Sequence, residues 1–200
     1  MSTTDATPNT TGLSQRPRRA DAQRNYDKLV AAAREAFTED GEAAKLDDIA
    51  KRAGVGPGTL YRNFPTRQHL LVAVYVDEVE GIARAADDLA GLEPWAALRQ
   101  WTRLFVDYIT TKRAIGAALL TYMDRDDEIF KSCRGAVFGA GDVLIERAQA
   151  AGDVRPDVTF SDLAPLLSGI AGMPNADAAM IDRSLDLVLD ALRYRPPTSS

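Results

Sequence analysis

Cysteine and histidine are nearly absent from this chain of 200 residues, which contains one of each. A single cysteine cannot form an intramolecular disulfide, and it suits a reducing compartment. His69 has no cysteine or histidine partner at the spacing of a metal site. Cys133 lacks the sequence context of a nucleophile, so it is either a plain thiol or a redox sensor. We therefore expect no enzymatic activity, no metal and no cofactor.

Long apolar segments and alternating strand patterns are also missing. No stretch approaches the roughly 18 apolar residues that span a bilayer. The N-terminus has no apolar run of the kind found in a secretory signal. Hydrophobic residues make up 46% of the chain, which is enough for a real core. We expect an all-α, cytoplasmic protein with no membrane partner.

Positive charge is scarce in most of the chain, whose net charge is −5. Residues 1–71 contain 11 Lys and Arg against 9 Asp and Glu, whereas residues 72–200 contain 13 against 20. The overall charge excludes a general nucleic-acid coat protein. A mildly basic N-terminal part followed by an acidic remainder is instead typical of a sequence-specific DNA-binding protein, because only the N-terminal part contacts the DNA phosphates.

Residues 46–64 carry the clearest pattern in the sequence. Two short amphipathic segments flank a glycine-containing turn, which is the layout of a helix-turn-helix whose second helix enters the DNA major groove. Gly54 stands where a helix ends in a left-handed residue, and Pro57 suits the first position of the next helix. The first segment places these residues on one face at helical spacing: Leu46, Ile49, Ala50 and Ala53.

The second segment separates an anchoring face from a free face. Successive helical residues turn by about 100°, so Leu60 and Phe64 share one face while Gly58 and Arg62 point the opposite way. The first face can attach to a core, and the second is left to meet a groove.

The segment GVGPGTLYRNFPTRQHL, with the preceding LDDIAKRA and YDKLVAAAREAFTEDG, resembles the DNA-binding domain of the tetracycline-repressor-like (TetR) family of bacterial regulators. The resemblance covers residues 22–75 and rests on the spacing of I-A-x-x-A-G-V, G-T-L-Y-x-x-F and F-P-T-R. It implies an N-terminal three-helix helix-turn-helix domain joined to a C-terminal helical ligand-binding and dimerisation domain, with about nine helices in all.

The resemblance also implies a set of DNA contacts. Polar side chains near the second helix match positions that touch the DNA backbone, and their donors suit phosphate. Gly58 lets the backbone approach base edges, and Arg62 donates either to guanine or to a phosphate. Tyr61 either touches DNA or packs within the domain. The DNA-binding candidates are Lys45, Pro57, Gly58, Thr59, Tyr61, Arg62, Asn63 and Arg67.

Two positions depart from the usual family pattern. Many members have serine where this chain has Gly56, so a capping side chain is absent there. Many also have threonine or serine where this chain has Lys45. Lysine cannot accept the capping hydrogen bond, and we expect it to supply a longer-range phosphate contact instead.

The chain divides into a tail, a head and a body. We expect a disordered basic tail over residues 1–20, which is either simply solvated or an arm that reaches DNA. The helix-turn-helix domain covers residues 21–66, and the effector-binding and dimerisation domain covers residues 67–195. Expected helices span residues 22–39, 46–53, 57–64, 67–90, 95–112, 161–171 and 177–194. We also expect a short apolar helical segment over residues 115–123 and a long helix that follows the acidic residues 124–127 and ends at about residue 151.

Most large aromatic residues lie in the expected body, where they either form the core or line a ligand pocket. Few charges interrupt these segments, so a largely apolar or aromatic effector is the better match. The pocket candidates are Trp101, Phe105, Tyr108 and Tyr122.

The final two expected helices carry apolar stripes that predict a partner surface. Two such helices from each of two subunits form a four-helix bundle, and the alternative is packing within one chain. The candidate dimer interface consists of Leu163, Leu167, Ile170, Ile181, Leu185, Val188 and Leu192.

The combined pattern predicts a one-component transcriptional regulator. We expect a ligand-responsive repressor that binds a palindromic operator in double-stranded DNA as a homodimer. One alternative is a DNA-binding dimer without a small-molecule ligand, regulated by a protein partner or by its abundance. A second alternative, an enzyme carrying a helix-turn-helix, requires a catalytic constellation that the sequence does not show.

Overall fold

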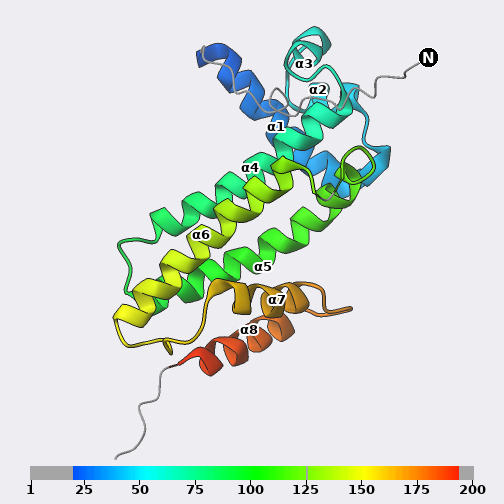
Figure 1. The fold of residues 1–200 in the computed structure, drawn as a ribbon. Coiled ribbons are helices and arrows are strands. Elements are labelled where there is room, and N and C mark those ends of the chain that lie inside the picture. The colour runs from blue at the N-terminus through cyan, green and yellow to red at the C-terminus, as the bar shows by residue number, and fades with distance from the viewer. Residues whose placement is uncertain (1–19, 125, 194–200) are drawn as a thin grey trace, which may run out of the picture. The chain divides into compact units, whose positions relative to one another are not determined.

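A computed structural model describes residues 20–124 and 126–193, and these residues fold into helices (Figure 1). The helices are α1 (Ala20–Asp40), the 3-10 helix η2 (Gly41–Ala43), α2 (Leu46–Arg52), α3 (Pro57–Asn63), α4 (Arg67–Asp88), α5 (Pro94–Leu119), α6 (Glu128–Ala150), α7 (Phe160–Ala171) and α8 (Ala178–Leu192). The part of the chain described contains no strand, only an isolated bridge between Val154 and Arg193. The all-α prediction is therefore confirmed.

No helix of the described residues is both long and apolar enough to cross a membrane. The tail predicted over residues 1–20 lies, except for Ala20, outside the described residues.

The α5 helix is longer than the sequence pattern predicted. We expected one helix to end near residue 112 and a separate apolar segment to follow, but α5 continues to Leu119. No proline interrupts residues 113–116, and a single glycine inside a helix costs only about 1 kcal/mol. The acidic cluster before α6 does cap that helix, because the Asp127 carboxylate accepts a hydrogen bond from the Ile129 N–H at 3.1 Å.

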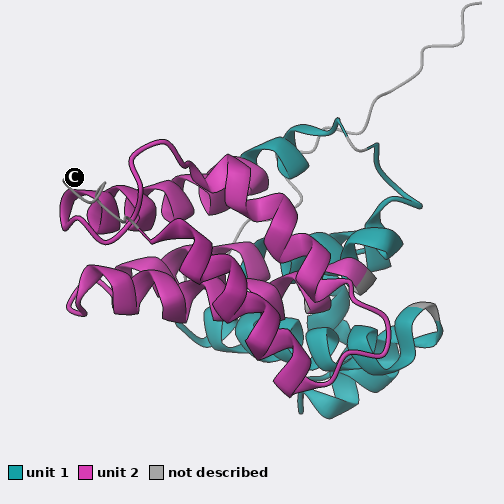
Figure 2. Ribbon diagram, turned by 90° about the horizontal axis from the view of Figure 1, so that it is seen from below, with its two compact units in different colours: residues 1–77, 114–132 teal, residues 78–113, 133–200 magenta. Residues whose placement is uncertain are grey.

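The chain forms two compact units, which are coloured separately in Figure 2. Unit 1 consists of residues 1–77 and 114–132, and unit 2 of residues 78–113 and 133–200. Unit 1 therefore includes the first half of α4. The domain boundary predicted between residues 66 and 67 stays a prediction.

In unit 1, α2 and α3 pack on α1 (Figure 1). The ring of Tyr26 on α1 lies 5.0 Å from that of Phe64, directly after α3. The predicted inner face of α1 is confirmed as buried, and it consists of Tyr26, Leu29, Val30, Ala33 and Phe37. The buried apolar face of α1 thus packs against both α2 and α3.

Unit 2 is organised around an aromatic core. Phe160 begins α7, and its ring lies 5.2 Å from Trp101, 5.1 Å from Phe105 and 5.3 Å from Phe138. The indole N–H of Trp101 donates to the carbonyl of Ile82 at 2.8 Å. Residues from α4, α5, α6 and α7 therefore meet in one core.

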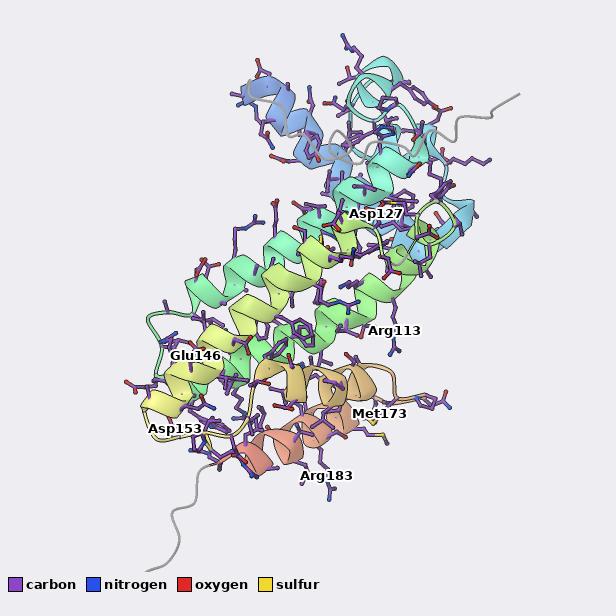
Figure 3. The ribbon with its side chains drawn as sticks, viewed as in Figure 1. Arg113, Asp127, Glu146, Asp153, Met173 and Arg183 are labelled. Carbon is purple, nitrogen blue, oxygen red and sulfur yellow. The ribbon has the colours of Figure 1, made fainter. Side chains whose placement is uncertain are left out.

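The outer helices α7 and α8 lie side by side (Figure 1). Arg113, labelled in Figure 3, extends from α5, and its guanidinium donates to the Ser168 carbonyl of α7 at 3.2 Å. Arg99 and Arg103 form ion pairs with Asp186 and Asp182 of α8. These polar contacts attach the outer layer to α5.

Candidate functional site

The turn between α2 and α3 has the geometry that its glycine predicts. Gly54 has a φ of +65°, in the left-handed region that only glycine adopts without steric cost. Its N–H donates to Lys51 at 3.1 Å, and the Val55 N–H donates to Ala50 at 3.0 Å. These bonds satisfy carbonyls at the end of α2 and fix the direction in which the chain leaves it.

The α3 helix presents one buried face and one exposed face, as its spacing predicts. Leu60 and Phe64 are buried, whereas Gly58 and Arg62 are exposed and Tyr61 is 45% exposed. Pro57 occupies the first turn of α3, and Gly56 caps it without a side-chain hydrogen bond. A Cβ at Gly58 would meet no neighbouring atom, so the backbone there is open to a large partner.

Polar side chains on and after this face bond to their own surroundings. Arg62 donates from Nε to the Gly58 carbonyl at 3.1 Å and from Nη2 to the Thr59 hydroxyl at 2.9 Å. The Asn63 amide donates to the Thr59 carbonyl at 2.8 Å, and the Tyr61 hydroxyl donates to Asp47 at 3.4 Å. The bonds of Arg62 and Asn63 lie within one helical turn at or near the surface and have neutral acceptors, so a charged acceptor such as phosphate can replace them.

The remaining two DNA-binding candidates lie at the edge of this surface. Lys45 is exposed at the start of α2 and makes no side-chain cap there. Arg67, the first residue of α4, is only partly exposed, and its guanidinium faces the backbone between α1 and α2. The structure thus brings seven candidates to or beside the α2–α3 surface and turns the eighth inward.

Ion pairs connect α1 with α2 and α1 with α4 near this surface. Arg52 at the end of α2 pairs with Glu39 at 2.9 Å and with Glu35 at 3.6 Å, both on α1. Arg34 of α1 pairs with Asp77 of α4 at 2.6 Å. Such partly exposed pairs each contribute little stability, but together they restrict how the helices can shift.

Comparison with known proteins agrees with this geometry. A family model of the bacterial regulatory proteins of the tetR family matches residues 29–74, and one of the C-terminal domain of SbtR-like transcriptional regulators matches residues 93–194. The chain belongs to the TetR family of bacterial transcriptional regulators.

Solved structures and a curated relative support the same membership. The TetR transcriptional regulator SCO0520 from Streptomyces coelicolor is 42% identical with a TM-score of 0.76, over 87% of this chain and 99% of that one. A TetR regulatory protein from Mycobacterium vanbaalenii is 34% identical with a TM-score of 0.75, over 89% and 100%. The transcriptional repressor KstR from Mycolicibacterium smegmatis is 39% identical over 90 residues, which are 43% of this chain and 44% of that protein.

The body of this TetR-family protein brings three of the four pocket candidates together. Trp101 stacks on Phe105 at 5.5 Å, and Phe105 lies 5.8 Å from Tyr108. All three are buried, and the first two belong to the aromatic core of unit 2. Tyr122 belongs to unit 1 and is 48% exposed. Their role in a pocket stays a prediction.

The structure places Lys112, which the sequence analysis did not single out, beside the pocket candidate Tyr108 and near Cys133. The Lys112 ammonium lies 5.1 Å from the centre of the Tyr108 ring. Burial lowers the pKa of Lys112, and burial raises the pKa of Cys133 to about 11, so this thiol remains protonated at neutral pH. Helical periodicity cannot predict that Lys112 and Cys133 lie near each other, because Lys112 belongs to α5 and Cys133 to α6.

The predicted dimer residues are largely covered within one chain. Leu163, Leu167, Ile170, Leu185 and Leu192 are buried, and Ile181 and Val188 are half-buried. The exposed large apolar side chains on the same two helices are Leu166, Met180 and Leu187. The burial of these five residues agrees with packing within one chain, whereas the three exposed residues are accessible to a partner.

Proposed function

We propose that this TetR-family regulator is a ligand-responsive repressor that binds a two-fold symmetric operator as a homodimer. The observation that carries the proposal is the exposed face of α3, where an open backbone at Gly58 lies beside Tyr61 and Arg62. An exposed helix of this size fits the major groove, and its first residues then face the base edges.

The α3 side chains divide into two groups by the contacts they can make. Arg62 carries a guanidinium that can donate twice to one guanine, once it leaves the Gly58 carbonyl and the Thr59 hydroxyl. Thr59, Tyr61 and Asn63 offer single donors suited to phosphate, and Lys45 adds a charge at the edge. Pro57 and Gly58 leave room for the backbone to approach.

The experiment that tests DNA binding is selection of duplexes from a random-sequence library by the purified protein, followed by footprinting. The proposal expects a palindrome whose half-sites are separated by about one helical turn or a multiple of it. Recovery of no enriched sequence, at low as well as moderate salt, would contradict it.

Arg62→Ala should then lose discrimination at one base pair of each half-site. The expected loss is on the order of 1–3 kcal/mol, because a bidentate contact to guanine would be removed. Binding of the variant to operators substituted at single positions measures this. A uniform loss across all operator variants would instead assign Arg62 to the phosphate backbone.

The same proposal places the dimer interface on α7 and α8. Leu166, Met180 and Leu187 supply exposed apolar contacts, and the half-buried Ile181 and Val188 flank them. Four helices from two subunits can bury these side chains in one bundle. The buried leucines behind them hold each pair of helices to its own chain.

The effector part of the proposal is a largely apolar or aromatic small molecule bound in the body. Its support is the aromatic content of unit 2, with the Tyr108 hydroxyl as a polar handle. One observation favours the alternative of a dimer without a small-molecule ligand. Trp101 and Phe105 already pack against each other and against Phe160, which is what a solid core requires.

Measurements of ligand binding and of DNA binding distinguish a dimer that responds to an effector from a dimer that has no small-molecule ligand. A true effector must weaken operator binding by the same factor by which operator DNA weakens effector binding, since coupling is reciprocal. Thermal-shift screening of apolar compounds, followed by this reciprocity measurement, tests the effector. A body that binds none of them would favour regulation by a partner or by abundance.

A further inference from the structure

The Arg67 side chain connects three segments of the head. Its Nη2 donates to the Gly41 carbonyl at 2.9 Å, and its Nη1 donates to the Ala44 carbonyl. The guanidinium carbon also lies 4.8 Å from the centre of the Phe37 ring on α1. One side chain at the start of α4 thus contacts the end of α1, the 3-10 helix η2 and the residue before Lys45, where α2 begins.

Electrostatics explains why the guanidinium takes this position. A positive charge at the first residue of a helix is unfavourable, because the helix N-terminus carries partial positive charge. The backbone just after α1 lies at the negative end of the dipole of that helix, and the Gly41 and Ala44 carbonyl oxygens there accept from the guanidinium. Turning from α4 toward Gly41 and Ala44 therefore moves the charge of Arg67 from an unfavourable environment to a favourable one.

Arg67 also links both ends of the helix-turn-helix formed by α2 and α3. The Ala44 carbonyl that it binds directly precedes Lys45, and the Lys45 carbonyl accepts the first backbone bond of α2 from Ile49 at 3.1 Å. At the other end, only residues 64–66 separate α3 from α4. The start of α4 is thus attached to the beginning of α2 through Arg67 and to the end of α3 through the chain.

We infer that Arg67 is a positioning residue for DNA binding, which acts by fixing the backbone before α2 against the start of α4. The inference rests on the proposed DNA-binding function. The planar shape of the Arg67 guanidinium matters as well as its charge, because one flat group contacts two carbonyls and one ring face at once. A phosphate contact, which the family resemblance implied for this position, depends instead mainly on positive charge.

Charge and shape can be separated with two substitutions. Arg67→Lys keeps the charge but lacks the planar fork, and Arg67→Met keeps most of the stem while removing the charge and all donors. If Arg67 positions the head, both variants should bind a library-selected duplex on the order of tenfold more weakly than wild type. The dependence of log K on log salt should be unchanged in both, because no phosphate contact is lost.

A phosphate contact gives a different result and would overturn the inference. Arg67→Lys would then bind nearly as wild type, and Arg67→Met would lower the salt slope by about 0.9. A purely structural role would also overturn it. In that case the variants would melt at lower temperature but would bind DNA with wild-type affinity when measured well below their melting temperatures.

Arg52→Lys is the matched control in the same head. Arg52 pairs with exposed carboxylates of Glu39 and Glu35, which lysine can also reach, so this variant should bind like wild type. An equal loss in Arg52→Lys would show that the head tolerates no such exchange, and the inference would fail. If wild-type protein selects no duplex at all, the proposed function fails instead, so the two failures are distinguishable.

Discussion

Gly141 lies in the interior of α6, directly against the ring of Phe160. A Cβ at this position would lie only 2.4 Å from Cγ of that ring. The ring cannot retreat easily, because Trp101, Phe105 and Phe138 surround it. The missing side chain of Gly141 is therefore what allows α6 and α7 to approach each other.

Gly141→Ala should lower the free energy of unfolding by about 1–3 kcal/mol, because one added methyl group overfills the core. The melting temperature should fall by roughly 2–4 °C for each kcal/mol in a chain of this size. Thermal denaturation followed by circular dichroism measures the change.

Gly139→Ala provides the control two residues earlier in the same helix. A Cβ there would have no neighbour within 4 Å. Alanine favours the helix over glycine by about 0.5–1 kcal/mol, so this variant should be slightly more stable than wild type. If both substitutions stabilise the protein, α6 and α7 do not approach as closely as described.

At the scale of the helix, the start of α7 is capped by the Asp162 carboxylate, which binds Thr159. The Asp162 carboxylate accepts from the Thr159 N–H at 2.9 Å and from the Thr159 hydroxyl at 2.7 Å. These hydrogen bonds, that of the side chain first, lower the pKa of Asp162. Because the folded pKa is lowered, the cap stabilises the protein above the ordinary pKa of aspartate and is lost as the pH falls through the folded value.

Thr159→Ala should raise the pKa of Asp162 toward that of a free aspartate, because the side-chain donor is removed. A pH titration of the Asp162 carboxyl carbon by NMR measures this. Thr159→Ser keeps the hydroxyl and should keep the lowered pKa. Equal pKa values in the alanine and serine variants would mean that the hydroxyl bond does not form.

At the scale of the whole molecule, the dimer proposal makes a sharp distinction between two neighbouring leucines. Leu187 is 65% exposed on α8, whereas Leu185 is 4% exposed and faces its own chain. Leu187→Glu should yield a folded monomer, since it places a charge in the interface without disturbing the core. Loss of the dimer should also abolish tight operator binding, because two half-sites are read together.

Sedimentation velocity with circular dichroism measures assembly and fold together. Val143→Glu is the control, because Val143 is 54% exposed on α6 and lies outside the proposed interface. Leu185→Glu should instead lower the stability of each subunit, which confounds assembly with folding. A Leu187→Glu protein that remains dimeric would require a different interface.

The sequence by itself determined the local geometry of the recognition unit. The left-handed Gly54, the helix start at Pro57 and the opposite faces of Leu60 and Arg62 follow from residues within one or two helical turns. The family pattern over residues 22–75 reflects the same short-range chemistry. A break after residue 112 was wrong, since no strong helix breaker stands there and α5 continues.

Only the tertiary structure determined which side chains and backbone groups from distant parts of the chain contact one another. Arg67 finds its carbonyl partners 23 and 26 residues earlier in the chain. Leu185 and Leu187 point to different faces of α8, and only the packing of the subunit shows which of the two faces is covered. Helical periodicity defines the faces of a helix, but neighbouring helices determine which face is covered. Trp101 and Phe105 show the same limit of sequence periodicity, because an aromatic stripe is expected both in a solid core and in the lining of a pocket. In the folded subunit, Phe160 of α7 packs against both rings and fills the space beside them.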